Sequence, residues 1–245
     1  MAQPDFGFLH PNPNAEIDYR AISLPDTLRY GNRLSPELLS YIPKPRVPGP
    51  ARMLDLGCGK QHLRPICTSI GYEYIGLDHE GDAPLLGDAA ALPLRDGSID
   101  LVVALAVLEH LRDPFIAMQE VRRVMRPGGT FIGTAAFLEP FHLRSYFHCS
   151  HLGLAHVLQT AGFTVSAVAP NAGWSGLRAL SRMGLFPRAP PWLLDALTLP
   201  IALTHRFWWR IGYALDRKEA RSEENRVRTT TAGFLFIARK PADRR

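Results

Sequence analysis

The stretch Met53-Leu54-Asp55-Leu56-Gly57-Cys58-Gly59 decides the fold class of this chain. It is an apolar run that contains one acid, Asp55, and leads into a turn with two glycines. Only residues without a Cβ let a backbone pass close to a bound ligand, and Gly57 and Gly59 meet that need. Cys58 lies between them and is predicted to line the same site. The motif predicts a strand followed by a ligand-binding turn, although a tight turn that binds nothing could have the same sequence.

Short apolar runs alternate with helical patterns on the C-terminal side of this turn, which is typical of βαβ units and a parallel sheet. Asp113-Pro114 provides an N-cap and a proline at the first helical position. The helix that follows should continue to Met125 and be terminated by residues 126–129, and another should run from Ser150 to Gly162. We predict an α/β fold with a mostly parallel seven-stranded sheet and an antiparallel last strand. Its strands should cover residues 52–56, 74–77, 85–86, 99–105, 130–136, 163–168 and 233–238.

Composition divides the chain into three segments. Residues 1–50 form an N-terminal extension with a short helix near 36–41 and a proline-rich linker at 43–50. Residues 51–170 together with 229–241 should form the sheet domain. Residues 171–228 interrupt what would otherwise be a hairpin of the last two strands. We predict a helical insertion or lid there, broken at Pro200 and highly charged over its last residues, 216–228.

The overall composition is that of an ordinary folded protein, with 46% hydrophobic and 21% charged residues in a chain of 245. The formal net charge of +5 does not by itself indicate nucleic acid, because an anionic membrane surface, an acidic substrate or plain solubility fits equally well. Three cysteines without a C-x-x-C pair argue against a disulfide framework. The start of the chain has no signal-peptide pattern, and no apolar run reaches membrane-spanning length. A cytoplasmic location is expected, with contact at the membrane surface as an option.

Acids after the next two strands complete a predicted nucleoside site. Asp78 ends the second strand, about twenty residues after the glycine turn, where a carboxylate can accept hydrogen bonds from both ribose hydroxyls. His79 follows and is included among the predicted contacts. After the third strand, Asp88 can accept from the adenine amino group while Ala89 packs on the ring. The alternatives are a solvated loop acid at Asp78 and a helix cap at Asp88.

Three acids at successive strand ends suit a cationic sulfonium cofactor, S-adenosylmethionine. A dinucleotide site must leave room for pyrophosphate and usually has a third glycine, whereas Lys60 and Gln61 follow Gly59 here. An NAD-dependent oxidoreductase would also need a hydride-site pair such as Tyr-Lys, which we do not find. The remaining rival is a regulatory or scaffold protein that binds S-adenosylmethionine or a nucleotide without transferase activity.

Five segments, in this order and spacing, resemble the class I S-adenosylmethionine-dependent methyltransferases of the type 11, ubiquinone-biosynthesis-like group. The resemblance extends from residue 53 to about residue 162, with a weaker match at 232–241. It implies a Rossmann-like three-layer α/β/α fold and S-adenosylmethionine as cofactor. The segments are LDLGCGKQ (54–61), YIGLD (74–78), GDAAALPLRDGSIDLV (87–102), VLEHLRDP (107–114) and EVRRVMRPGG (120–129).

The same resemblance implies roles for individual residues. Asp55, Gly57 and Gly59 would line the methionine and ribose side. The backbone from Ala104 to Ala106 would close over the methionine part. The acids after the second and third strands keep the nucleoside roles given above.

A finer resemblance is to methyltransferases found with polysaccharide and cell-envelope glycan genes. It rests on GCGKQ (57–61), on Phe141-His142, on the run 146–150 and on FLFIARKP (234–241). That subgroup tends to have Asp-Tyr-x-Arg-x-Thr where this chain has Ser145, His148 and Ser150 in place of the acid, the basic residue and the threonine. The acceptor residues of the subgroup are therefore not carried over.

Methyl transfer from a sulfonium is an in-line displacement with a neutral leaving group, so alignment and exclusion of water are the main tasks. A general base is needed only for a hydroxyl or a protonated amine. The candidate bases are His142 and His148 after the fifth strand and His110 after the fourth. Alternatively, Glu109 and His110 order the loop. The histidines lack the spacing of a structural zinc site, so we predict no metal.

The acceptor is predicted to be a small molecule, a glycan or a lipid-linked compound, with a hydroxyl oxygen as the methylated atom. No Asp/Asn-Pro-Pro-Tyr or Pro-Cys signature follows the fourth strand, so no nucleic-acid partner is expected. Tryptophans beside arginines within Trp192–Arg228 suit a peripheral membrane contact, but a lid or a dimer contact is the favoured interpretation. The oligomeric state stays open.

Overall fold

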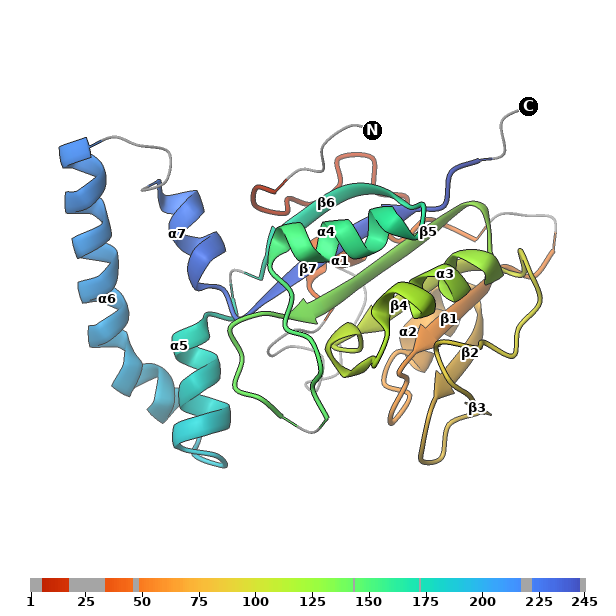
Figure 1. Ribbon diagram of the computed structural model, residues 1–245, viewed down its shortest axis with the longest axis horizontal. Helices are drawn as coiled ribbons and strands as arrows, with labels where there is room; N and C mark the ends of the chain where they lie inside the picture. The colour runs from red at the N-terminus through yellow and green to blue at the C-terminus, as the bar shows by residue number, and fades with distance from the viewer. Residues whose placement is uncertain are drawn as a thin grey trace.

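A computed structural model describes residues 6–17, 34–45, 49–142, 144–171, 173–216 and 222–242. Seven strands form one sheet in the order β3-β2-β1-β4-β5-β7-β6 (Figure 1). All neighbouring pairs are parallel except those of β7, which is antiparallel to both β5 and β6. The predicted fold class is therefore confirmed. The strands are β1 (Arg52–Leu56), β2 (Glu73–Asp78), β3 (Leu85–Leu86), β4 (Ile99–Leu105), β5 (Met125–Ala136), β6 (Thr164–Pro170) and β7 (Gly233–Arg239).

Strand β5 starts earlier than predicted. Met125 already pairs with Ile99, so α3 (Pro114–Val124) ends one residue before Met125, the last helical position predicted, and residues 126–129 belong to the strand. The reason is a contact that is distant in sequence. The backbone of Lys240, which follows β7, accepts from the N–H of Gly128 and donates to the carbonyl of Gly129. These bonds hold the residues after α3 in an extended, strand-like path.

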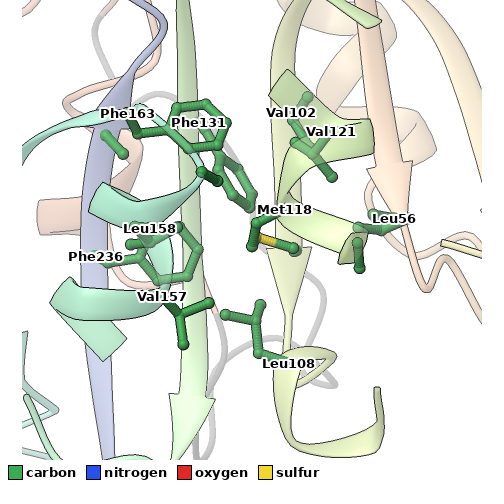
Figure 2. Close-up of a cluster of buried hydrophobic side chains, with 14 of the residues drawn as sticks. Leu56, Val102, Leu108, Met118, Val121, Phe131, Val157, Leu158, Phe163 and Phe236 are labelled. Carbon is green, nitrogen blue, oxygen red and sulfur yellow. The ribbon is translucent and has the colours of Figure 1, made fainter. Parts of the chain in front are cut away.

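Side chains from the two faces of the sheet form two separate cores. In β4, Val102 and Ala104 belong to one core, and Leu101 and Val103 belong to the other, which is the period of two expected of a strand. Helices α3 and α4 (His151–Thr160) cover the first core, part of which Figure 2 shows around Met118. Helices α1 (Pro36–Leu39) and α2 (Arg64–Ile70) cover the second. The arrangement is the predicted three-layer α/β/α fold.

The predicted helix starts are confirmed by their caps. The carboxylate of Asp113 accepts from the backbone N–H groups of Phe115 and Ile116 at 3.0 Å, and Pro114 is the first residue of α3. The hydroxyl of Ser150 accepts from the N–H of Gly153 at the start of α4. Both helices therefore begin where their side-chain caps satisfy free backbone donors.

The segment between β6 and β7 is helical, as predicted. It contains α5 (Gly176–Ala179), the π-helix η3 (Leu180–Leu185), α6 (Pro191–Asp216) and α7 (Glu223–Thr230). The prediction that Pro200 breaks the long helix was wrong, because α6 continues through it. Pro200 and Ala196, four residues earlier, are both exposed. Pro200 has no N–H group to donate to the carbonyl of Ala196. Because that carbonyl can be hydrated instead, the helix tolerates an internal proline.

Candidate cofactor and acceptor site

The glycine turn lies at the carboxyl end of the sheet, where the parallel strands β1, β2 and β4 all end. The N–H groups of Gly57 and Cys58 both donate to the carbonyl of Leu77, at 2.8 and 3.1 Å. The turn after β1 is thereby fixed on the end of β2. This is the edge at which open α/β sheets bind their ligands.

Both glycines of the turn have left-handed backbones, with φ of +70° at Gly57 and +46° at Gly59. A Cβ on Gly57 would lie 2.6 Å from Cγ2 of Val107, in the loop after β4, so that position needs glycine for conformation and for space. A Cβ on Gly59 would meet nothing within 4 Å. The side of Gly59 that lacks a side chain is thus open, which fits a close approach by a cofactor.

Asp78 connects the first two loops of the site. Its Oδ2 accepts from the N–H of Gly59 at 2.9 Å, and its Oδ1 accepts from the N–H of His79 at 2.8 Å. The ring Nδ1 of His79 lies 3.0 Å from the same Oδ1. The structure therefore brings together Gly59, Asp78 and His79, all of them predicted cofactor residues. Their contact with a ribose stays a prediction.

Asp55 is almost completely buried beneath the turn, and its Oδ2 accepts a hydrogen bond of 2.7 Å from the hydroxyl of Tyr74. Burial raises the pKa of Asp55 to about 7; the charge of Asp78 adds to this and the Tyr74 hydrogen bond opposes it. Sequence reasoning missed Tyr74, which looks like an ordinary strand aromatic. The glycine at position 76 is the sequence feature that accompanies this contact, because a Cβ there would lie 2.8 Å from the Tyr74 hydroxyl oxygen.

Asp88 and Ala89 follow β3 in a tight turn. The carboxylate of Asp88 accepts from the N–H of Ala90 at 2.9 Å, and its carbonyl accepts from the N–H of Ala91. Asp88 therefore caps a turn, and the alternative of a helix cap was wrong because no helix begins there. Ala89 is buried, while Leu86 at the end of β3 is exposed. The adenine contact of Asp88 and Ala89 stays a prediction.

The loop after β4 turns sharply at Ala106, whose φ is +57°. A left-handed alanine is strained by about 1–2 kcal/mol, and such strain is concentrated at functional sites. The hydroxyl oxygen of Thr134 on β5 holds this conformation by accepting from the N–H of Ala106 at 2.9 Å. Ala104 is fully buried in register with Leu56 and Gly133. The backbone predicted to close over methionine is thus fixed by β5.

Glu109 is a buried acid next to this loop, in the 3₁₀ turn η2 (Leu108–His110). It is 1% exposed, and neither carboxylate oxygen makes a full hydrogen bond within the described residues. Burial raises its pKa to about 7, with a contribution from the charge of Glu139. A buried acid without a satisfying partner is costly and calls for a functional explanation.

The predicted histidines gather around Glu109. A carboxylate oxygen of Glu109 and one ring nitrogen each of His110 and His142 lie within 4.8 Å of one another. The two imidazole rings meet edge to face, with their centroids 5.1 Å apart. The ring of His148 lies 6.3 Å from that of His142. Burial lowers the pKa of His110, and the charges of nearby histidines, among them His79, add to this. The cluster therefore lies within electrostatic reach of the predicted nucleoside side.

Hydrogen bonds across the loops explain why these residues meet. The carbonyl of Glu109 accepts from the N–H groups of Tyr146 and Phe147 at 2.6 and 3.2 Å, which ties the loop after β5 to the loop after β4. The Nδ1 atoms of His142 and His148 lie 3.1 Å from the carbonyls of Pro140 and Phe137. These carbonyls favour a proton on Nδ1, so each Nε2 is left as the proton acceptor.

Sequence reasoning missed a second buried acid in this region. Glu139 accepts a 2.7 Å hydrogen bond from the indole of Trp174, and its other oxygen lies 3.9 Å from Nδ1 of His142. Burial raises the pKa of Glu139. Nothing in the chain indicates this pairing, because 35 residues separate its partners.

Comparisons with known proteins show the family of this chain. Residues 54–133 match the methyltransferase domain family. A protein of Encephalitozoon cuniculi that is named as a methyltransferase is 30% identical over 147 residues, which cover 46% of this chain and 70% of that protein. A probable S-adenosylmethionine-dependent methyltransferase of Mycolicibacterium smegmatis is 33% identical over 137 residues, covering 46% of this chain and 52% of the relative. The chain thus spans about half the length of this mycobacterial relative.

The fold and the site at the strand ends are those of the Rossmann-like S-adenosylmethionine-dependent methyltransferases. This chain belongs to the methyltransferase family. An S-adenosylmethionine-dependent methyltransferase from Mesorhizobium loti has the same fold, with a TM-score of 0.51 and 17% identity over 83% of this chain and 96% of that one. The predicted cofactor, S-adenosylmethionine, is confirmed by family and fold. The finer resemblance has no support, since none of these relatives is named for glycan synthesis.

The residues present also fit this cofactor chemically. The carboxylate of Asp78 lies at the glycine turn and can accept hydrogen bonds from the ribose hydroxyls of the cofactor. Gly59 has open space on its free side. The turn lacks the third glycine that is usual in dinucleotide sites, because Lys60 and Gln61 follow Gly59.

Proposed function

We propose that this chain transfers a methyl group from S-adenosylmethionine to a hydroxyl oxygen of a small-molecule, glycan or lipid-linked acceptor. The observation that carries the proposal is the cluster of Glu109, His110 and His142 beside the loop after β4. A hydroxyl must lose its proton as it is methylated, and an imidazole is the side chain best suited to take that proton near neutral pH.

Asp78 and the glycine turn would hold the cofactor, which supplies an electrophilic methyl group when bound. The fixed backbone at Ala106 would orient its methionine part. The protein's contribution is then to align the acceptor oxygen with that methyl group and to exclude water. A buried hydrogen bond between Glu139 and Trp174 fixes the loop after β5 to the segment after β6.

His142 is the preferred base. Its Nδ1 faces the carbonyl of Pro140, which leaves Nε2 free to accept the proton of the acceptor hydroxyl. His110 is a second candidate, because its lowered pKa keeps it neutral and able to accept a proton. In His148 the Nε2 atom is buried without a hydrogen-bond partner among the described residues, so a proton reaches it less directly. Glu109, with a pKa of about 7, can take up the proton from the histidines.

The test is turnover with S-adenosylmethionine carrying a labelled methyl group and a panel of hydroxylated metabolites, glycans and lipid-linked sugars. The readouts are adenosylhomocysteine and a labelled product. His142→Asn should lower kcat about 10²–10⁴-fold and leave the affinity for S-adenosylmethionine unchanged. His156→Asn, on the exposed side of α4, is the matched control and should behave as the wild type. Full kcat in His142→Asn would contradict the proposed base.

Cofactor binding without turnover on any acceptor class would favour the rival function, a regulatory or scaffold protein. That outcome would leave the fold and the cofactor site intact. It would contradict the proposed methyl-transfer activity.

A further inference from the structure

Helix α6 projects away from the sheet and exposes most of its apolar side chains (Figure 1). It contacts α5, η3 and α7 along one side, where Leu194 is buried. Trp192 is 71% exposed and Trp208 is 72% exposed. Other large apolar residues of the helix are also exposed: Leu193, Leu197, Leu199, Ile201, Leu203, Phe207, Tyr213 and Leu215. A set of this size is far from the scattered single residues of an ordinary surface.

These residues have a helical order. Trp192, Ala196, Leu199, Leu203 and Phe207 recur every three or four positions, so they form one stripe on the face opposite Leu194. The stretch from residue 196 to residue 204 has no charged side chain on any side of the helix. An exposed apolar surface of this size marks an interaction site.

The net charge of the insertion that contains α6 indicates which kind of partner binds this surface. Residues 171–228 contain ten basic and five acidic residues, so this segment carries +5, which is the formal net charge of the whole chain. The rest of the chain has equal numbers of acids and bases. Arg206 and Arg210 lie one turn apart and flank Phe207 and Trp208. A second copy would bring two segments of +5 together, whereas an anionic surface attracts them.

The charged residues along α6 argue against a transmembrane arrangement. Its 26 residues extend over about 39 Å, but its uncharged stretch is too short to cross a bilayer. Within the described residues, no helix has the length and apolarity of a membrane span. A long helix with an exposed apolar stripe, exposed tryptophans and nearby arginines instead matches helices that lie in the plane of the membrane interface.

We propose that α6 docks this protein on the surface of an anionic lipid bilayer. Trp192, Leu199, Leu203 and Phe207 enter the headgroup region, and the arginines contact lipid phosphates. The proposal rests on the exposed helix and its charge, and it holds whichever acceptor the enzyme uses.

The experiment is flotation of the full chain with vesicles of phosphatidylcholine alone and with vesicles that also contain phosphatidylglycerol. The wild type should float with the anionic vesicles and much less with the neutral ones. The triple variant Leu199→Gln, Leu203→Gln and Phe207→Gln should lower the partition coefficient by at least about tenfold. The control is Leu152→Gln, which replaces an equally exposed leucine on α4 and should bind as the wild type.

The arginines are tested separately by Arg210→Gln, which should weaken partitioning about fivefold and reduce its sensitivity to salt. Tryptophan emission should shift to the blue on addition of anionic vesicles, and Trp192→Phe should diminish the shift. Far-ultraviolet circular dichroism checks that each variant is folded, which is expected because the replaced side chains are exposed.

Failure of the folded wild type to float with anionic vesicles would overturn the proposal. Equal flotation of the triple variant would do the same. A dimer in solution that the triple variant dissociates, without flotation of either form, would show that a second copy covers α6.

Discussion

The carboxylate of Asp78 accepts a 2.9 Å hydrogen bond from the backbone N–H of Gly59, so one side chain at the end of β2 fixes the turn that follows β1. Asp78 thereby shapes the glycine turn. Its remaining lone pairs are predicted to accept from the ribose hydroxyls. Loss of the side chain therefore affects the site before any ligand arrives.

Asp78→Ala should weaken binding of S-adenosylmethionine about 10- to 150-fold, the equivalent of one or two hydrogen bonds to a charged group. Asp78→Asn should lose less, since an amide oxygen can still accept from Gly59. Isothermal titration calorimetry measures both, and Asp82→Ala, at an exposed position nearby, is the control. An affinity of Asp78→Ala equal to that of the wild type would refute the ribose role.

Gly57→Ala should destabilise the fold by about 2–4 kcal/mol, because it combines a left-handed backbone with a close contact to Val107. Gly97→Ala measures the free-energy cost of a left-handed alanine without a steric clash, since Gly97 has φ of +59° and open space around it. Adding Val107→Ala to Gly57→Ala should recover part of the loss. Denaturant unfolding of the wild type, Gly57→Ala, Val107→Ala and the double variant completes a double-mutant cycle, and simple additivity would show that no clash exists.

Stability should decrease as pH rises through neutrality. The pKa of Asp55, about 7 in the folded state, lies above its ordinary value of 3.8, so the native state holds the proton more tightly. The resulting stabilisation is complete below about pH 4 and is lost as pH rises through 7, by up to about 4 kcal/mol. Glu109, also with a pKa of about 7, acts in the same direction.

Asp55→Asn and Glu109→Gln should therefore each flatten the pH dependence of the unfolding free energy, and the double variant should flatten it further. Chemical denaturation of the ligand-free protein between about pH 5 and 8 measures this. A steep dependence that survives in the double variant would mean that other groups cause it.

The proposed proton transfer through Glu109, His110 and His142 needs no metal. Dialysis against EDTA should leave both the affinity for S-adenosylmethionine and the methyl-transfer rate unchanged. These three residues do present the atoms that a divalent metal takes. Loss of turnover on chelation, with recovery on adding a divalent ion, would replace the proton-transfer account with a metal-assisted one.

Much of the fold could be predicted because its signals are local. Strands β1, β3 and β4 lie where their apolar runs place them, and Asp113 and Ser150 cap helices that immediately follow them. The errors have distant causes. Lys240 extends β5 towards α3, and an exposed setting lets α6 continue through Pro200.

The same distinction between local signals and contacts distant in sequence applies to the site. The strand-end acids could be found because parallel strands place them at one edge of the sheet. The meeting of His110 with His142 could not, because it depends on hydrogen bonds between two loops. The pairing of Glu139 with Trp174 left no local pattern at all.

The most direct test of the central claim is calorimetric titration of the folded wild-type chain with S-adenosylmethionine and with adenosylhomocysteine. The site built from Asp55, Gly59 and Asp78 predicts saturable binding of both, with one ligand per chain. Absence of binding at millimolar ligand, in protein shown to be folded by circular dichroism, would contradict it.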